Sequence, residues 1–249
     1  RALKIKPDYA DAESVMLHQL DNICDWNHLN LLNDPCARLG ITTKAVSPFA
    51  LLSSEDNAER QLTRSRNWAS ETYKQVPLPL PAKPTVRPKR LKIGYFSADF
   101  HNFPGMYLMA GMLQEHDREK FQIILFSYGP DKNDSMRKRL IESADDFIDI
   151  RLDQDDAVVA LSRMHEIDIA IHRNGYTQNN RSALFQSRLA PIQINYLGYP
   201  SSMGADFIDY IIADPTVIPS SQRQHYSENV IYLPHSYQPN DDQRQIAQT

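Results

Sequence analysis

Leu91-Lys-Ile-Gly-Tyr-Phe-Ser97 and Phe121-Gln-Ile-Ile-Leu-Phe-Ser127 are two short apolar runs that decide the fold of this chain. Both are rich in β-branched and aromatic residues, and a stretch with helical spacing of its apolar residues separates them. By the same rules, further strands are predicted over 167–172, 192–197, 207–214 and 229–233, and helices over 107–116, 135–143, 157–165 and 182–188. Strands that alternate with helices indicate βαβ units, so we predict an α/β fold with a mostly parallel, doubly wound sheet.

The residues upstream of these strands are predicted to be all-α. Apolar residues recur every three or four positions over residues 11–23, which is the spacing of one helix face. Further helices are predicted over 26–39 and 54–73. The stretch Pro-Asp-Tyr-Ala-Asp-Ala at 7–12 is compatible with the end of a helical repeat array, although one copy shows no period.

The composition shifts once along the chain, at the stretch VPLPLPAKPTVRPKR. It holds five prolines and four basic residues without an acidic one. Proline lacks the backbone N–H that helices and central strands need, so this stretch is predicted to be an extended linker. We therefore predict a helical segment over 1–75, a proline-rich linker over 76–90, an α/β lobe over 91–238 and a polar tail over 239–249.

Composition also excludes several classes of protein. Lys and Arg number 27 against 31 Asp and Glu, and a net charge of −4 argues against general nucleic-acid binding. Two cysteines, Cys24 and Cys36, do not make a disulfide-rich scaffold or a four-cysteine zinc site, and no metal site is predicted. No apolar run approaches the roughly 20 residues that span a bilayer, and the chain opens with no leader pattern. We expect no membrane partner and a cytoplasmic location.

The loop after the first strand is the first candidate for function, because doubly wound sheets bind ligands beyond the carboxyl ends of their strands. It contains Asp99, His101 and Asn102. Three such polar side chains in one loop cost free energy when they are buried, unless they take part in function or stay in contact with water. The alternative is that Asp99 or Asn102 caps the following helix and that His101 is merely exposed.

Two later loops and one residue are also candidates. The loop that begins His172-Arg-Asn-Gly-Tyr-Thr177 suits an oxygen-rich ligand such as a sugar or phosphate, unless it is a polar surface loop. The loop over 197–207 has two glycines, a proline and two serines, and its N–H groups suit a phosphate or a sugar hydroxyl, unless it is a plain connection. His235, after the last strand, is either catalytic or a linker residue.

Six motifs, in this order, resemble the O-GlcNAc transferase/SPINDLY family. They are Ile93-Gly-Tyr-Phe-Ser-Ala-Asp-Phe-His101, Asn174-Gly-Tyr-Thr177, Ala190-Pro-Ile-Gln-Ile-Asn-Tyr-Leu-Gly-Tyr-Pro200, Asp209-Tyr-Ile-Ile-Ala-Asp214, Gln224-His-Tyr-Ser-Glu228 and Tyr232-Leu-Pro-His-Ser-Tyr-Gln-Pro-Asn-Asp241. The resemblance covers residues 91–242. Residues 21–52 look like the helical region that precedes the catalytic part in bacterial members, and residues 2–12 look like the end of their tetratricopeptide repeats.

The resemblance implies a GT-B glycosyltransferase, which has two Rossmann-like lobes with a nucleotide sugar between them and requires no metal. This chain would supply the N-terminal lobe, preceded by a tetratricopeptide-like segment that recruits the acceptor protein. The implied reaction is inverting transfer of a sugar to Ser or Thr of a protein. GlcNAc from UDP-GlcNAc is the most expected sugar, and the SPINDLY branch transfers fucose. The donor is a substrate, so no cofactor is expected.

Strand-end placement and the resemblance together select the candidate site. Asp99, His101 and His172 are predicted to be catalytic. The predicted substrate-binding residues lie in the later loops and are Asn174, Gly175, Tyr176, Thr177, Gly198, Tyr199, Pro200, Ser201, Met203 and His235.

Three departures from the family bear on activity. Many bacterial members have an acidic residue at the position of His172. Family members carry a histidine, proposed as a catalytic base, two residues beyond His101, whereas this chain has Phe103, which cannot accept a proton. The second lobe, with most of the UDP contacts, would follow Asp242, and only seven residues remain, so the chain alone is predicted to be inactive. The alternatives are a catalytically degenerate module that binds a peptide or glycan, and a scaffold whose helical segment mediates oligomerisation.

Overall fold

The computed structural model describes residues 2–29, 34–75, 78–79, 86 and 88–243 of the chain. Most of the predicted linker and the last six residues of the predicted tail lie outside these residues. The chain forms two compact units. The helical unit comprises Arg1–Lys74, Pro200–Asp206 and Ser220–Asn229, and the α/β unit comprises Gln75–Tyr199, Phe207–Pro219 and Val230–Thr249. The domains predicted from the sequence were continuous ranges, whereas the helical unit also takes in two segments from late in the chain.

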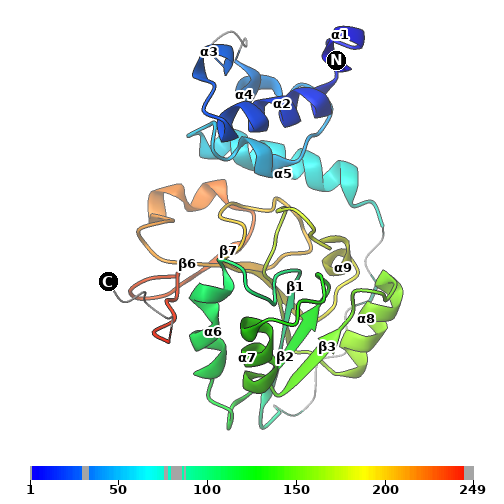
Figure 1. The fold of residues 1–249 in the computed structure, drawn as a ribbon, viewed down its shortest axis with the longest axis vertical. Coiled ribbons are helices and arrows are strands. Elements are labelled where there is room, and N and C mark those ends of the chain that lie inside the picture. The colour runs from blue at the N-terminus through cyan, green and yellow to red at the C-terminus, as the bar shows by residue number, and fades with distance from the viewer. Residues whose placement is uncertain (1, 30–33, 76–77, 80–85, 87, 244–249) are drawn as a thin grey trace. The chain divides into compact units, whose positions relative to one another are not determined.

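The helical unit consists of short helices around a small apolar core. Its elements are α1 (Ala2–Ile5), α2 (Ala10–Asn22), α3 (Trp26–Leu29), α4 (Pro35–Arg38), a 3-10 turn at Pro48–Leu51, α5 (Ala58–Thr72) and a second 3-10 turn at Ser220–His225 (Figure 1). The core is made of Ala10, Leu17, Cys36, Leu39, Val46 and Leu51.

The single helix predicted over 26–39 is wrong. Two short helices, α3 and α4, stand in its place. Pro35 has no N–H to donate inside a helix, so it begins α4 instead. Asp34, in the left-handed conformation, caps the new helix by accepting a hydrogen bond from the Ala37 N–H at 3.1 Å.

Arg64 joins α5 to the segment that contains α4. Its side chain is among the largest that are fully buried. Its Nε donates to the Leu39 oxygen at 2.7 Å, its Nη2 donates to the Cys36 oxygen at 2.6 Å, and Glu55 lies 3.1 Å from its Nη1. These contacts compensate the positive charge of Arg64, which α5 buries on its narrow apolar face.

The α/β unit contains a sheet flanked by helices (Figure 1). The strands are β1 (Leu91–Ser97), β2 (Phe121–Ser127), β3 (Asp146–Asp149), β4 (Ile169–His172), β5 (Ile192–Asn195), β6 (Tyr210–Ala213) and β7 (Asn229–Tyr232). The helices are α6 (Met106–Gln114), α7 (Ser135–Ser143), α8 (Asp155–Met164) and α9 (Ala183–Gln186).

The strand order of the sheet is β3-β2-β1-β4-β5-β6-β7. Strands β1 to β6 pair in parallel with their neighbours. The order reverses between β1 and β4, which is the topological switch point of a doubly wound sheet. The predicted α/β, Rossmann-like class is thereby confirmed. The short edge strand β3 was not predicted.

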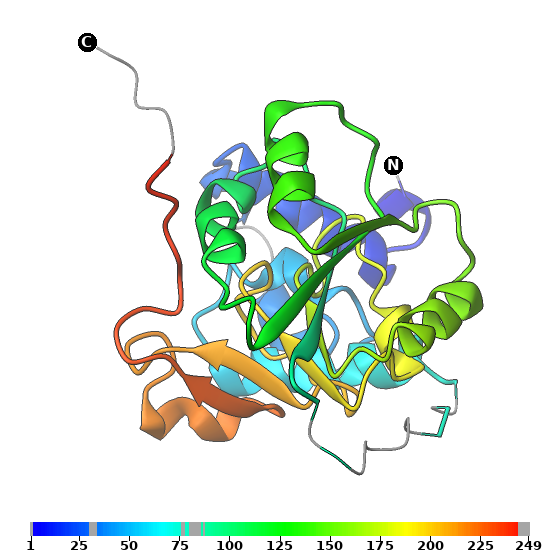
Figure 2. The same ribbon diagram turned by 90° about the horizontal axis from the view of Figure 1, so that it is seen from below.

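Both faces of the sheet are buried, so β1 and β2 read as continuous apolar runs in the sequence. Tyr95 belongs to the core on the side of α6 and α7. Its neighbour Phe96 points to the other side, where its ring stacks on that of Phe126 at 4.3 Å and meets Phe185 of α9 at 5.6 Å. Figure 2 shows the two pairs of helices, α6 with α7 and α8 with α9, on opposite sides of the sheet.

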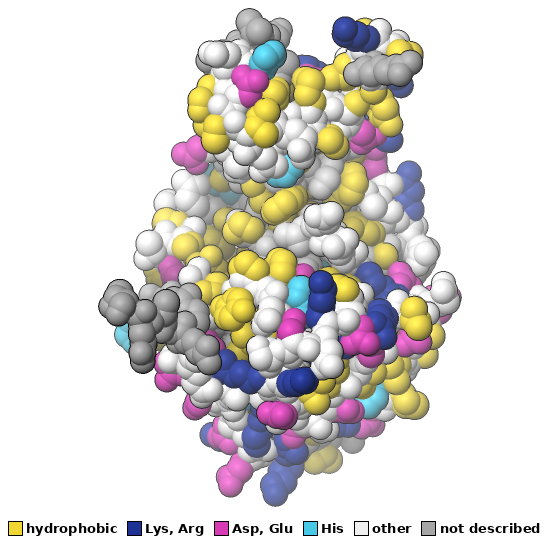
Figure 3. All heavy atoms as spheres, viewed as in Figure 1, with side chains coloured by type: hydrophobic (Ala, Val, Ile, Leu, Met, Phe, Trp, Pro, Cys, Tyr) yellow, Lys and Arg dark blue, Asp and Glu magenta, His cyan; other side chains and the backbone are white. Residues whose placement is uncertain are grey.

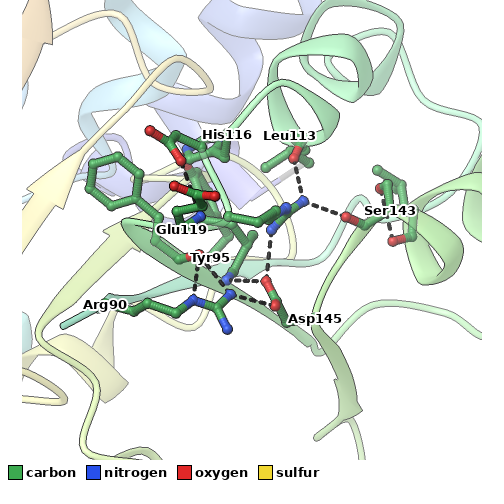
Figure 4. Close-up of polar contacts among 12 residues, drawn as sticks. Arg90, Tyr95, Leu113, His116, Glu119, Ser143 and Asp145 are labelled. Carbon is green, nitrogen blue, oxygen red and sulfur yellow. Dashed lines mark hydrogen bonds and ion pairs between the residues drawn. The ribbon is translucent and has the colours of Figure 1, made fainter.

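A group of ionic contacts ties the elements together near the amino ends of β1 and β2 (Figure 4). We call Arg90, Arg118 and Asp145 the amino-edge cluster. Asp145 accepts hydrogen bonds from the Arg90 Nη2 at 2.6 Å, the Arg118 Nη1 at 2.8 Å and the Ile123 N–H at 2.8 Å. Beside the cluster, the Tyr95 hydroxyl lies 3.1 Å from the His116 Nε2.

The surface carries both signs of charge. On the face drawn in Figure 3, basic and acidic side chains are interspersed over the α/β unit, as the near balance of 27 and 31 charges leads one to expect. Among the described residues, no helix combines the length and the apolar character needed to cross a membrane.

Candidate functional site

Asn174, just past β4, is the centre of a buried polar network at the switch point. Its Oδ1 accepts hydrogen bonds from the Ser97 Oγ at 3.0 Å, the Ala98 N–H at 3.1 Å and the Tyr128 hydroxyl at 3.0 Å. Its Nδ2 donates to the Asp99 Oδ2 at 2.8 Å. These partners follow or end β1 and β2, so one side chain holds together the carboxyl ends of three neighbouring strands.

Arg173 completes this network by forming an ion pair with Asp99. The Arg173 residue is only 3% exposed, and its Nε has no hydrogen-bond partner among the described residues. Burial lowers the pKa of Arg173, and the Asp99 carboxylate opposes that shift. The guanidinium carbon lies 5.6 Å from the centre of the Phe103 ring. We call Ser97, Asp99, Tyr128, Arg173 and Asn174 the switch-point network.

His172 is the last residue of β4, directly before Arg173 in the chain, and it is fully buried. Its ring stacks on Phe185 with centroids 4.2 Å apart, and its Nε2 lies 2.8 Å from the Ser182 Oγ. That hydroxyl also lies 2.7 Å from the Asn180 Oδ1 and 2.9 Å from the Gly175 oxygen, which can only accept its hydrogen, so we assign the imidazole proton to Nε2. Burial lowers the pKa of His172 to about 3, and the ring is neutral at pH 7. Its predicted catalytic role stays a prediction, and it requires a rearrangement to expose the ring.

His101 lies on the loop between β1 and α6 and is partly exposed. Its ring centre is 5.8 Å from that of Phe103, and its Nδ1 is 3.2 Å from the Asn102 oxygen. The alternative explanation of this loop, that Asp99 or Asn102 caps the next helix, is wrong, because α6 begins at Met106, its N-cap residue is Gly105, and no side chain caps it. Instead, the Asn102 N–H donates to the Asp134 Oδ2 at 2.9 Å.

The loops after β4 and β5 pack against each other in the α/β unit. Gly175 has φ of +52°, and the rings of Tyr176 and Tyr199 meet edge to face at 5.3 Å. The Thr177 Oγ1 donates to the Asn174 oxygen at 2.8 Å. A Cβ on Gly198 would overlap the backbone oxygen of Arg173, so that position requires glycine. The structure therefore brings together the predicted residues 174–177 and 198–199.

The other predicted residues lie elsewhere. Pro200, Ser201 and Met203 belong to the helical unit, where Ser201 and Met203 are buried. His235 is exposed in the segment after β7, in the α/β unit.

A cavity of about 850 Å³ adjoins the β1–α6 loop within the α/β unit. Its walls include Asn102, Pro104 and Tyr107 from that loop and α6, and Arg139 from α7. Such mixed apolar and hydrogen-bonding walls are typical of ligand sites. Among the described residues, no group of three His, Cys, Asp or Glu side chains is arranged to hold a metal ion.

Residues 70–248 match the model of a family described as glycosyl transferase family 41. This chain belongs to glycosyl transferase family 41. The resemblance inferred from the six motifs is thereby confirmed.

Several relatives carry names that state an activity. The chain is 32% identical, over 91% of its length, to the probable UDP-N-acetylglucosamine–peptide N-acetylglucosaminyltransferase SEC of Arabidopsis thaliana, and covers 25% of that protein. It is 34% identical, over 60% of its length, to the UDP-N-acetylglucosamine–peptide N-acetylglucosaminyltransferase of Caenorhabditis elegans, and covers 13% of it. The chain thus spans a quarter or less of these relatives. A solved mutant of the Thermobaculum terrenum O-GlcNAc transferase has the same fold, with a TM-score of 0.72 at 24% identity over 96% of this chain and 40% of that one.

Three members of the switch-point network were missed by sequence reasoning. Arg173 was noted only as part of a polar loop, and Ser97 and Tyr128 were not singled out. Ser97 closes an apolar strand and Tyr128 directly follows one, and a polar group at that place is the signal that could have found them. Arg173 directly follows β4 and carries the same signal, but its partner Asp99 is 74 positions away, so their pairing is not visible in the sequence.

Proposed function

We propose that this family 41 chain forms the first α/β lobe of a protein O-glycosyltransferase. The donor is a nucleotide sugar, with UDP-GlcNAc favoured over nucleotide-linked fucose, and the acceptor is a Ser or Thr hydroxyl of a protein. The observation that carries the proposal is the buried switch-point network, which lies where doubly wound sheets bind their ligands. The names of relatives that match most of the chain support the same activity. A cytoplasmic location remains part of the proposal.

The three predicted catalytic residues differ in what they can do. In inverting transfer, the acceptor hydroxyl attacks the anomeric carbon while UDP leaves, and a base receives the hydroxyl proton. His101 is partly exposed, whereas His172 is buried and neutral. Asp99 is already engaged by Arg173 and Asn174, which suits it to positioning the loop. Within the proposal, His101 is therefore the residue that contacts the acceptor, and residues 174–177 and 198–199 of the α/β unit hold the sugar. The substrate-binding roles of Pro200, Ser201 and Met203 stay predictions.

A second candidate function is a degenerate module that binds a peptide or glycan without transferring sugar. It is favoured by Phe103, whose side chain replaces the expected base and lies over Arg173. The residue is 38% exposed, so an apolar or sugar surface could pack against it.

Transfer by the complete protein, as the cell makes it, separates the two functions. Labelled UDP-GlcNAc and a pool of Ser/Thr peptides are the substrates. We expect label on the peptides and a rate at least about tenfold lower in His101→Ala. His28→Ala is the matched control, because His28 is exposed in the helical unit and, among the residues that the structure describes, pairs with Asp25 alone. Peptide or glycan binding by calorimetry without transfer of either sugar would establish the degenerate module, and an unchanged rate in His101→Ala would remove His101 from the mechanism.

A further inference from the structure

Glu228 is a buried carboxylate in the helical unit for which the proposed function has no use. It is 4% exposed and ends the motif Gln224–Glu228. Its Oε1 accepts a hydrogen bond from the Met203 N–H at 2.7 Å. Its Oε2 accepts from the Ser202 Oγ at 2.6 Å and from the Ser227 Oγ at 3.1 Å. Burial raises the pKa of Glu228, and the hydrogen bonds from Ser202 and Met203 oppose that shift.

Ser202 extends this set of contacts into the backbone. Its hydroxyl donates its one hydrogen to Glu228 and accepts from the Gly204 N–H and the Ser227 N–H, each at 3.1 Å. A hydroxyl has one hydrogen and two lone pairs, so its capacity is fully used. Two successive amides of the Pro200–Asp206 loop, those of Met203 and Gly204, are thus satisfied by side chains that are themselves buried and linked.

The opposite side of the loop rests on α5. Gly204 has φ of +60°, and a Cβ there would lie 2.5 Å from the backbone nitrogen of Arg66. Only glycine combines that conformation with such a close approach. Backbone contact with α5 and hydrogen bonds to Glu228 therefore hold the same loop.

A buried acid that only stabilises a fold is normally paired with a cation, as Glu55 is with Arg60 and Arg64 in the same unit. Glu228 has no ion pair among the described residues and is held by hydrogen bonds from the loop and its own segment. The hydrogen bonds that offset the desolvation cost of Glu228 therefore also hold the loop in place. We propose that Glu228 is a positioning residue that fixes the Pro200–Asp206 loop, so that the exposed Pro200 at the start of the loop is presented to substrate. The contact with substrate rests on the proposed function, whereas the placement of the loop by Glu228 does not.

Amide exchange in the 249-residue chain tests the placement. In Glu228→Ala, the Met203 and Gly204 amides are expected to exchange at least about tenfold faster, with the amides of α5 unchanged. Glu228→Gln is expected to restore most of the protection, because its amide oxygen accepts from Met203 while its nitrogen donates to a serine hydroxyl. Glu55→Ala is the matched control, because the Glu55 side chain is buried in the same unit but pairs with Arg60 and Arg64, and the Met203 and Gly204 amides donate to other acceptors. Unchanged exchange at Met203 and Gly204 in Glu228→Ala, or the same selective loss in Glu55→Ala, would overturn the proposal.

Ser202→Ala serves if Glu228→Ala does not fold. It keeps the carboxylate but removes the acceptor of Gly204 and Ser227, so faster exchange is expected at Gly204 with Met203 still protected. Protection of Gly204 in this variant would overturn the network.

Kinetics of the complete protein test the link to substrate. Glu228→Ala is expected to raise KM for donor or acceptor about tenfold with kcat within about threefold, and Glu228→Gln to stay near the wild type. Unchanged KM values would overturn the link. If the wild type transfers no sugar, the proposed transferase function fails, while the exchange experiment still decides whether Glu228 places the loop.

Discussion

The amino-edge cluster and the switch-point network are two arginine–carboxylate groups at opposite ends of the same strands. In the amino-edge cluster, the side chains of Arg90 and Arg118 are about a third exposed and Asp145 is 22% exposed. In the switch-point network, the side chain of Arg173 is 4% exposed and that of Asp99 is 12% exposed. The arginine–carboxylate contacts are therefore partly exposed to water at the amino ends of the strands and desolvated at the carboxyl ends. An exposed pair adds little stability, whereas a buried pair is costly to break, and only the buried one lies where a ligand would bind.

Removal of Arg173 is expected to have the largest effect. Arg173→Ala leaves the Asp99 carboxylate buried without its cation and should lower the free energy of unfolding by about 3–5 kcal/mol. Urea unfolding of the chain measures it. The double variant Asp99→Asn with Arg173→Met should recover most of the loss, because a neutral packed pair carries no desolvation cost. A loss below about 1 kcal/mol in Arg173→Ala would mean that the pair behaves like an exposed one.

Gly198→Ala is expected to follow, at about 1–3 kcal/mol, because its Cβ would overlap the Arg173 oxygen and force the two loops apart. Gly111→Ala in α6 is the control. Its Cβ would lie 3.0 Å from the Asp241 Oδ1, and the gain in helix propensity of about 1 kcal/mol offsets that contact. Thermal unfolding of the two variants compares them, and equal losses would contradict a special role of close packing at the carboxyl edge.

The contribution of the amino-edge cluster to the stability of the fold should depend on pH. Burial alone would raise the pKa of Asp145, but the Ile123 N–H and the Arg90 side chain outweigh it and hold that pKa below its ordinary value. A lowered carboxylate pKa stabilises the fold above the unfolded-state value of about 3.9, and this is lost as pH falls through the folded-state value. Asp145→Asn should therefore cost about 1 kcal/mol at pH 7 and converge with the wild type in strong acid. Stability curves that stay parallel at all pH values would contradict this.

The smallest expected effect is that of Arg90→Ala, about 0.5–1 kcal/mol at low salt and less at 1 M salt, because exposed ion pairs are screened. The cost of Arg173→Ala should change little over the same range. Salt titrations of both variants by urea unfolding supply the measurement, and a stronger salt effect at Arg173 than at Arg90 would reverse the assignment of exposed and buried pairs.

The sequence-based predictions were most accurate where the signal lies within a short stretch of the chain. The predicted bounds of β1, β2 and α7 agree with the structure, because the strands are long apolar runs and the structure starts α7 at a local cap, in which Asp134 accepts a hydrogen bond from the Arg137 N–H. Strand β3 reads Asp-Phe-Ile-Asp and is too short and acidic to stand out, and it forms because β2 offers an open edge. The candidate site stays a prediction. The structure brings residues 174–177 and 198–199 together, but the burial of His172 and the pairing of Arg173 were not visible in the sequence.

By itself, the sequence determined the alternation of strands and helices, the parallel sheet that follows from it, and membership of the family. These depend on periodicity and motifs within short windows. Only the tertiary structure decided that Arg173 pairs with Asp99, that His172 stacks on Phe185, and that Glu228 satisfies the Met203 amide. The reason is that burial and partner choice depend on residues far apart in the chain, and a polar side chain in a loop has the same local sequence whether it meets water or another buried group.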